Sequence, residues 1–485
     1  MPEPTLFGIS EEGKRCTRMP QPDVPAAAPD EMIPAAHLRD EPPNLPRVSE
    51  PEIAQHFARL AGENFNVDAN FYPLGSCTMK YNPKVHESIA SEAGWTRLHP
   101  EMPEEAAQGA MRLMHQLESW LAEILGMEAV SLQPPAGAAG EFTSLRIFRA
   151  CHDSRGETRR RVIVPDTAHG TNPASVARCG YTVTALQSGD DGRVDLGELE
   201  DALDDDVAAM MLTNPNTLGL FETEVLEIAR LVHEAGALLY CDGANLNAIM
   251  GHARPGDMGF DAVQVNLHKT FSTPHGGGGP GSGPVAVTAE LAPFLPVPRM
   301  IESGDGRLAW DWDRPQSIGK VHAFYGNFLV AVRAWAYILS MGAEGLRRVS
   351  EDAVLNANYV MHMLQDEWDL PYPGPCMHEC VLSAKAMLQE TGVRAADVAK
   401  RLLDFGIHPP TMYFPIIVDE ALMIEPTETE SRSTLERFIA VMLQIADEAR
   451  EEPRRLHDAP RRTPVRRVDE VKAAREPILR WRPVE

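Results

Sequence analysis

The sequence has few cysteines, no long apolar run and a deficit of basic residues. Its seven cysteines are odd in number and unevenly spaced, which argues against a disulfide framework and suits free thiols in a reducing compartment. No apolar run reaches the roughly 20 residues that a membrane helix needs, and the N-terminus lacks the features of a secretory signal. The net charge of −25 disfavours nucleic acid and anionic membranes as partners. We therefore expect a cytoplasmic protein.

The 485 residues suffice for several lobes with a sizeable core. Residues 1–110 are rich in proline and polar residues, so we expect an extended segment that packs on other lobes or on a partner subunit. The sequence then predicts a large α/β domain at 111–344, a smaller α+β domain at 345–450, and an Arg- and Pro-rich C-terminal tail at 451–485.

Helical and strand-like segments alternate through the predicted large domain. This alternation favours a mainly parallel sheet with helices on both faces, whose sites form beyond the carboxyl ends of the strands. The predicted strands are 162–164, 182–186, 207–212, 237–241, 262–265 and 284–287. The spacing also predicts helices at 111–126, 195–203, 222–235, 324–341, 346–367 and 394–405, and strands of the smaller domain at 380–383 and 414–418.

An acid and a lysine follow two successive predicted strands. Asp242 comes directly after the first, and Lys269 follows the second in a turn rich in His, Thr and Ser. Pyridoxal phosphate needs both groups, because an amine forms the resting Schiff base and a carboxylate pairs with the pyridinium nitrogen. Each residue has an ordinary alternative, a solvated lysine or a helix N-cap. Their pairing favours the cofactor, and we place Ala244 and His268 beside it.

A loop of small residues precedes a predicted helix and contains Gly137, Ala138 and Ala139. Amides at a helix N-terminus, with the positive end of the helix dipole, bind anions such as a phosphate group. This loop is therefore the candidate phosphate site, to which Thr273 would add a hydroxyl group. Loops of this composition are common, so the signal depends on its place before the other motifs.

Two further polar residues follow predicted strands. His169 lies among small residues, where an imidazole would stack on the cofactor ring or transfer a proton; we favour stacking. Asn214 follows the strand before Asp242, where an Asn of the aspartate-aminotransferase type of fold hydrogen-bonds the pyridine 3′-oxygen. It would serve equally as a turn residue before Pro215.

Two other patterns carry less weight. The glycine-rich run 276–283 lacks the Gly-Lys-Ser/Thr of a nucleotide loop and precedes a strand rather than a helix. The segment 376–380 holds Cys, His and Glu, but without a second ligand cluster these are better explained as packing residues. We expect no metal.

Together these motifs resemble one family, the P-protein of the glycine cleavage system (glycine decarboxylase), and within it subunit 2 of the two-subunit form. The resemblance covers nearly the whole chain. It is carried by Leu74-Gly-Ser-Cys-Thr-Met-Lys80, Ala168-His-Gly-Thr-Asn-Pro-Ala-Ser175, Asp242-Gly-Ala-Asn245, Asn266-Leu-His-Lys-Thr-Phe271, Leu355-Asn-Ala-Asn-Tyr359, Asp404-Phe-Gly-Ile-His-Pro-Pro-Thr411 and Ile424-Glu-Pro-Thr-Glu-Thr-Glu430.

The resemblance implies a pyridoxal-phosphate-dependent transferase of fold type I, with Lys269 as the cofactor lysine. It implies decarboxylation of glycine, transfer of the aminomethyl group to the lipoyl arm of the H-protein, and assembly with a homologous subunit 1 as α2β2. His408, Thr411 and Tyr413 are expected on the substrate side. One departure is that Pro135 and Ala139 replace the family's usual Asn and Gln, so side-chain contacts from those positions are not carried over.

Two alternatives remain open at this point. One is another pyridoxal-phosphate lyase acting on a small substrate, such as an aldolase or a desulfurase. The other is a non-catalytic half that only shapes its partner, which the presence of both Asp242 and Lys269 disfavours.

Overall fold

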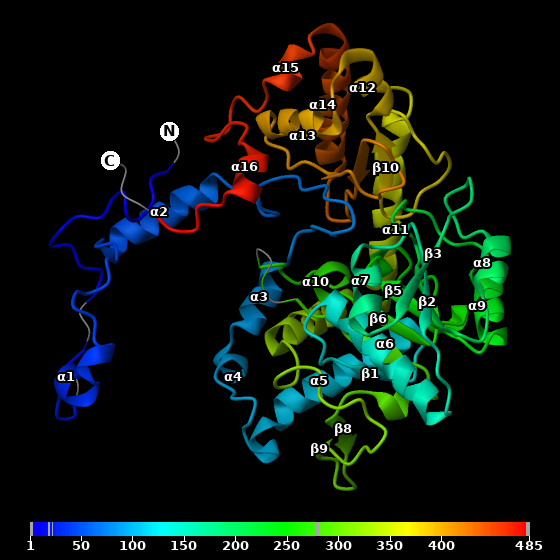
Figure 1. Ribbon diagram of the computed structural model, residues 1–485, viewed down its shortest axis with the longest axis horizontal. Coiled ribbons are helices and arrows are strands. Elements are labelled where there is room, and N and C mark those ends of the chain that lie inside the picture. The colour runs from blue at the N-terminus through cyan, green and yellow to red at the C-terminus, as the bar shows by residue number, and fades with distance from the viewer. Residues whose placement is uncertain (1–2, 18–19, 22, 277–278, 280, 482–485) are drawn as a thin grey trace. The chain divides into compact units, whose positions relative to one another are not determined.

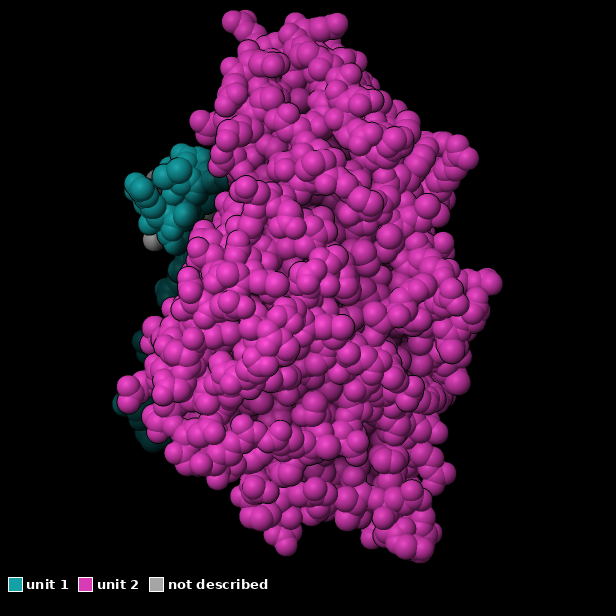
Figure 2. Space-filling view, turned by 90° about the vertical axis from the view of Figure 1, so that its right-hand side faces the viewer, with its two compact units in different colours: residues 1–66, 458–485 teal, residues 67–457 magenta. Residues whose placement is uncertain are grey.

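The computed structural model describes residues 3–17, 20–21, 23–276, 279 and 281–481. The chain divides into two compact units, residues 1–66 with 458–485 and residues 67–457, coloured separately in Figure 2. The first unit contains helices α1 (Pro29–Met32), α2 (Glu50–Gly62) and α16 (Glu470–Arg475). Within it the ring of Phe7 stacks on that of Trp481 at 4.6 Å. The finer boundaries expected at 110, 344 and 450 stay predictions.

The second unit is built on a seven-stranded sheet of order β1-β7-β6-β5-β4-β2-β3 (Figure 1). Only β7 runs antiparallel to its neighbours β1 and β6, so the predicted mainly parallel sheet is confirmed. Its strands are β1 (Ala129–Ser131), β2 (Arg161–Pro165), β3 (Thr182–Leu186), β4 (Val207–Thr213), β5 (Leu238–Gly243), β6 (Ala262–Val265) and β7 (Val285–Val287). A separate hairpin joins β8 (Arg299–Glu302) and β9 (Leu308–Asp311).

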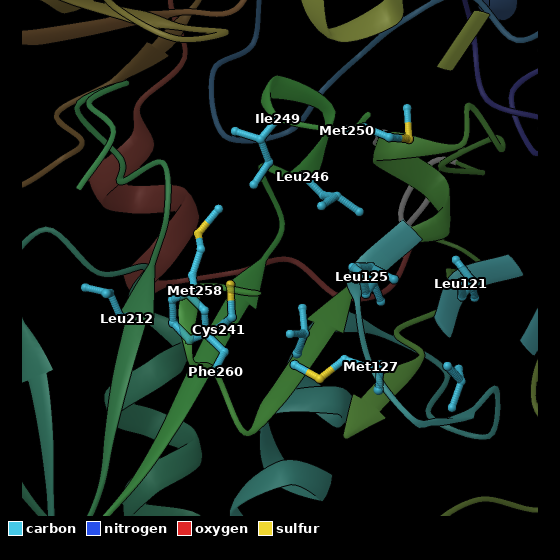
Figure 3. Close-up of a cluster of buried hydrophobic side chains, with 14 of the residues drawn as sticks. Leu121, Leu125, Met127, Leu212, Cys241, Leu246, Ile249, Met250, Met258 and Phe260 are labelled. Carbon is cyan, nitrogen blue, oxygen red and sulfur yellow. The ribbon is translucent and has the colours of Figure 1, made fainter. Parts of the chain in front are cut away.

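Helices cover both faces of this sheet. Along β5, Leu239 and Cys241 join a core with one group of helices, whereas Leu238 and Tyr240 join a second core on the opposite face. Such burial on both sides is typical of a parallel sheet. Figure 3 shows part of the first core. The helices of the first core are α5 (Glu104–Leu125), α9 (Val225–Glu234) and α11 (Phe328–Leu364). The second core contains α6 (Gly137–Ser154) and α7 (Thr171–Arg178). Helix α8 (Leu196–Ala202) precedes β4.

Helix α11 is broken at Gly342, whose φ of 63° and ψ of 178° are not helical. The break separates the two helices that the sequence predicts at 324–341 and 346–367. The first half packs in the core beside the large sheet, and the end of the second half packs in the core of the smaller lobe. By length and composition alone α11 passes the test for a membrane span, as buried core helices also do.

The smaller lobe carries a three-stranded antiparallel sheet of order β10-β12-β11. Its elements are β10 (Cys380–Ser383), α12 (Lys385–Thr391), α13 (Ala395–Asp404), β11 (Thr411–Met412), β12 (Ala421–Ile424), α14 (Arg432–Glu451) and α15 (Arg454–His457). The strand predicted at 414–418 is wrong, since this segment forms turns. Pro415 has no amide hydrogen for a strand ladder, and Tyr413 has a left-handed φ of 56°.

Candidate active site

Lys269 lies in the short helix α10 (Leu267–Thr270), directly after β6. The residue is 9% exposed, and its Nζ donates a hydrogen bond to the carbonyl oxygen of Ser76 at 2.6 Å. Its charge acts on a ring of surrounding titratable groups, namely Cys77, Glu141, His169, His268, His275, His378, Glu379 and Glu425. The lysine is therefore the centre of a buried polar cluster.

Asp242 lies near the carboxyl end of β5, beside β6 in the sheet. Its side chain is 2% exposed, and its two oxygens accept hydrogen bonds from Asn172 Nδ2 at 3.0 Å and from the Ala244 amide at 3.1 Å. The bond to Ala244 is the local contact expected of a cap or turn. The bond from Asn172, at the start of α7, holds the carboxylate from a neighbouring element. Ala244 is partly exposed.

The charge of Asp242 also acts on His169 and Glu141. Nδ1 of His169 lies 2.8 Å from Thr171 Oγ1, and that hydroxyl donates to Glu141 Oε1 at 2.6 Å. Burial lowers the pKa of His169, although the charge of Asp242 opposes this shift. Burial and then the charge of Asp242 raise the pKa of Glu141 to about 7. The sequence did not single out Glu141, because a lone Glu in a helix has no distinctive pattern.

The candidate phosphate loop forms the first turn of α6, an 18-residue helix. The first amides of a helix have no partner inside it, so those of Gly137, Ala138 and Ala139 are available to an anion. A Cβ on Gly137 would lie 2.7 Å from Asn266 Oδ1, so this turn passes close to the end of β6. The Oγ1 of Thr273 is buried with no hydrogen-bond partner among the described residues.

Two predicted site residues have local partners. Asn214 accepts a hydrogen bond from the Glu222 amide at 3.0 Å, and its Nδ2 lies 4.0 Å from Met258 Sδ. The contact of Asn214 with the cofactor stays a prediction. The Nδ1 of His268 accepts from the Ser282 amide at 3.2 Å, and burial lowers the pKa of this imidazole to about 3. Gly277, Gly278 and Pro280 of the glycine-rich run lie outside the described residues.

The smaller lobe reaches the same cluster through the loop 72–78. The ring of His408 stacks on Tyr72 at 3.6 Å, and Thr411 Oγ1 donates to the Gly75 carbonyl at 2.7 Å. Tyr413 differs, because it is 45% exposed and its hydroxyl accepts from the Ala396 amide on α13. Of the three residues expected on the substrate side, His408 and Thr411 thus contact the loop that holds Lys269.

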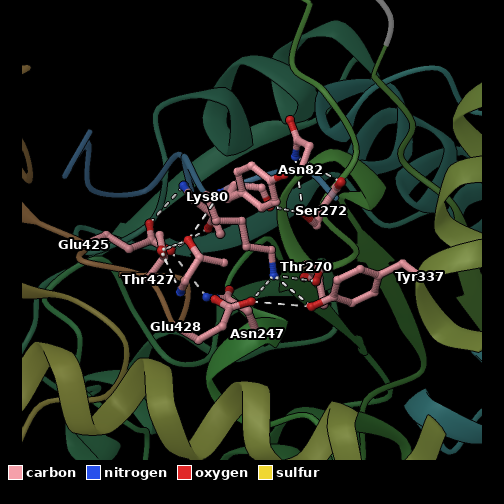
Figure 4. A network of polar contacts seen from close by, with 12 residues as sticks. Lys80, Asn82, Asn247, Thr270, Ser272, Tyr337, Glu425, Thr427 and Glu428 are labelled. Atoms are coloured by element: carbon pink, nitrogen blue, oxygen red, sulfur yellow. Dashed lines mark hydrogen bonds and ion pairs between the residues drawn. The ribbon is translucent and has the colours of Figure 1, made fainter. Parts of the chain in front are cut away.

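Four residues that the sequence analysis did not select complete the site. Glu379, Glu425 and His378 are fully buried near the loop 72–78, and side-chain atoms of the three lie within 4.8 Å of one another. Lys80 donates from Nζ to Glu428 at 2.6 Å and to the Thr270 carbonyl at 2.9 Å (Figure 4). The expectation that no metal binds here stays a prediction.

The residues present fit a pyridoxal phosphate group. A buried amine and a buried carboxylate follow adjacent strands, a helix N-terminus offers amides, and the nearby Thr273 hydroxyl lacks a partner in the described chain.

Residues 138–301 match the family Aminotransferase class-V. A crystal structure of glycine decarboxylase (P-protein) of the glycine cleavage system superposes with a TM-score of 0.72 at 21% identity, covering 87% of this chain and 95% of that one. The fold and the site define a pyridoxal-phosphate-dependent enzyme of fold type I.

The relatives make the assignment narrower. Two proteins named "Probable glycine dehydrogenase (decarboxylating) subunit 2" are similar over their full length: that of Caldanaerobacter subterraneus is 57% identical over 98% of each chain, and that of Desulforamulus reducens 56% over all of each. Residues 349–462 match the glycine dehydrogenase C-terminal domain. The chain belongs to the family of glycine dehydrogenase (decarboxylating) subunit 2.

Proposed function

We propose that this chain decarboxylates glycine and passes the aminomethyl group to the lipoyl arm of the H-protein. The observation that carries the proposal is the buried pair of Lys269 and Asp242 after adjacent parallel strands. When bound, pyridoxal phosphate supplies an electron sink for the electron pair left as CO2 departs. A site that excludes water favours loss of CO2 from bound glycine, because water no longer stabilises the charged carboxylate of the ground state.

In this proposal each residue has one task. Lys269 binds the cofactor through Nζ, and Asp242 keeps the ring nitrogen protonated. His169 stacks on the ring. The first amides of α6 at Gly137, Ala138 and Ala139, with the Thr273 hydroxyl, hold the phosphate; Ala244 and His268 border the ring. His408, Thr411 and Tyr413 face the substrate.

The chain would work with partners in the cytoplasm. We infer a complex with a homologous subunit 1, because the relatives are named as subunit 2. We expect two copies of each, since most oligomers have closed symmetry. Sedimentation of the coexpressed pair should give a 2:2 mass. A lone monomer with full turnover would contradict this.

The first experiment tests whether Lys269 carries the cofactor. Borohydride treatment of the chain with pyridoxal phosphate should add the mass of the reduced cofactor to the Lys269 peptide, and Lys269→Arg should abolish it. The exchange of carbon between bicarbonate and glycine, with subunit 1 and lipoylated H-protein present, should then occur in the wild type only. Labelling without exchange would favour an aldolase or a desulfurase, and no labelling would favour a non-catalytic subunit.

A further inference from the structure

Two buried carboxyl groups lie beneath the turn that contacts Lys269. Glu379 directly precedes β10, and Glu425 directly follows β12. The two strands are antiparallel and pair with Cys380 opposite Ile424, so both residues lie at the same end of the sheet. Both residues are 0% exposed. Glu379 Oε2 accepts from the Ser76 amide at 2.7 Å, and Glu425 accepts from the Thr78 amide at 3.0 Å.

The two carboxyl groups have unequal hydrogen bonding. Besides the Thr78 amide, Glu425 accepts from Thr78 Oγ1 at 2.5 Å and from Asn247 Nδ2 at 3.3 Å, as suits an ionised carboxylate (Figure 4). Oε1 of Glu379 has no hydrogen-bond partner in the described chain and lies 3.6 Å from His378 Nε2, which also has none. A protonated Glu379 would place its hydroxyl group beside this imidazole nitrogen.

The turn at residues 75–78 has an unfavourable backbone conformation that its surroundings must stabilise. Ser76 and Thr78 have φ of 61° and 43°, a left-handed conformation that is unfavourable for residues with a Cβ, most of all for the branched Thr. On the other side, a Cβ on Gly75 would lie 2.2 Å from Met423 Cγ, so the turn packs tightly on β12. In this arrangement the Ser76 carbonyl oxygen accepts a hydrogen bond from Lys269 Nζ at 2.6 Å.

We propose that Glu379 and Glu425 share one proton, held on Glu379, and act as positioning residues that keep the Ser76 carbonyl against the Lys269 amine. This positioning role rests on the proposed function of Lys269; the shared proton does not.

The electrostatics agree with this assignment. Burial raises the pKa of both carboxyl groups. Hydrogen bonds from Thr78 oppose this shift at Glu425, whereas at Glu379 the charge of Glu425 adds to it and the pKa lies well above its ordinary value. The other groups facing the pair are Lys269, the thiols of Cys77, Cys376 and Cys380, and His378, whose pKa burial lowers to about 3, so that its ring is neutral. Lys269 is therefore the cationic side chain that faces the pair, and a second ionised carboxylate would lack a compensating charge.

Infrared spectroscopy of the full-length chain tests the shared proton. At about pH 8, where ordinary carboxyls are ionised, the wild type minus Glu379→Gln difference spectrum should contain the carbonyl band of a protonated acid. The difference spectrum for the exposed control Glu390→Gln should lack a lost band of this kind. A Glu379→Gln difference without the band would overturn the assignment.

The positioning role has a separate readout, the rate at which the cofactor-free chain forms a borohydride-reducible link between pyridoxal phosphate and Lys269. Glu425→Gln removes the charge and one accepting oxygen of the acceptor, and Thr78→Val removes the hydroxyl donor. Each should slow labelling by about tenfold or more. Thr78→Ser keeps the hydroxyl and should restore most of the rate, and Glu379→Gln should stay within about threefold because it mimics the neutral acid.

Thr78→Val or Glu425→Gln chains that melt as the wild type does and label at its rate would refute the positioning role. A wild-type chain that does not label refutes the proposed role of Lys269 and the positioning role with it, whereas the infrared result decides the shared proton by itself.

Discussion

Asp242 is the residue whose charge the proposed chemistry uses most directly. Asp242→Asn keeps the size of the side chain but removes the charge, so we expect bicarbonate–glycine exchange to fall at least about tenfold, as for loss of a charged hydrogen bond. Asp201→Asn, on the exposed surface of α8, is the matched control and should leave exchange unchanged. Equal exchange in the two variants would show that the ring nitrogen does not depend on Asp242.

Glu141 should make the stability of the chain depend on pH. Its pKa is raised from 4.5 to about 7, so the folded chain keeps a proton that the unfolded chain releases between these values. The free energy of unfolding therefore falls as pH rises through this window. In Glu141→Gln the fall should be smaller by up to about 1.4 kcal/mol per pH unit. Urea unfolding of both chains from acidic to neutral pH measures this, and identical slopes would contradict the prediction.

At the scale of elements, the start of α6 depends on glycine. A Cβ on Gly140 would lie 2.3 Å from Gln264 Cγ and 2.8 Å from the Gly283 carbonyl, so Gly140→Ala should lower the free energy of unfolding by about 1–3 kcal/mol. Gly109, exposed in α5, has nothing within 4 Å of such a Cβ. Gly109→Ala should raise stability by about 0.5–1 kcal/mol. Thermal unfolding should show these opposite signs.

Most strands of the large sheet and the polar residues that follow them could be predicted, because buried strands are short apolar runs and their ends carry polar residues. Contacts between distant segments could not. Ser76 meets Glu379, and Thr78 meets Glu425, across more than 300 residues, and nothing in either segment identifies the other. The turn at 414–418 has an apolar composition like that of a strand, and Pro415 and its neighbours' backbone angles decide against one.

For the whole molecule, Lys80 joins the large sheet lobe to the smaller lobe. Its buried ammonium binds the Thr270 carbonyl after β6 and Glu428 after β12. Lys80→Met leaves Glu428 without a counter-charge and should cost about 3–5 kcal/mol of unfolding free energy. Adding Glu428→Gln should recover part of this loss. A double variant no more stable than Lys80→Met in chemical denaturation would contradict the pairing.

The buried ammonium also limits how a reaction partner gains access. Parting the lobes at Lys80 would break its ion pair with Glu428 and its hydrogen bond to the Thr270 carbonyl. In the proposed transfer to the H-protein we therefore expect the two lobes to stay together at Lys80 while the lipoyl arm reaches Lys269.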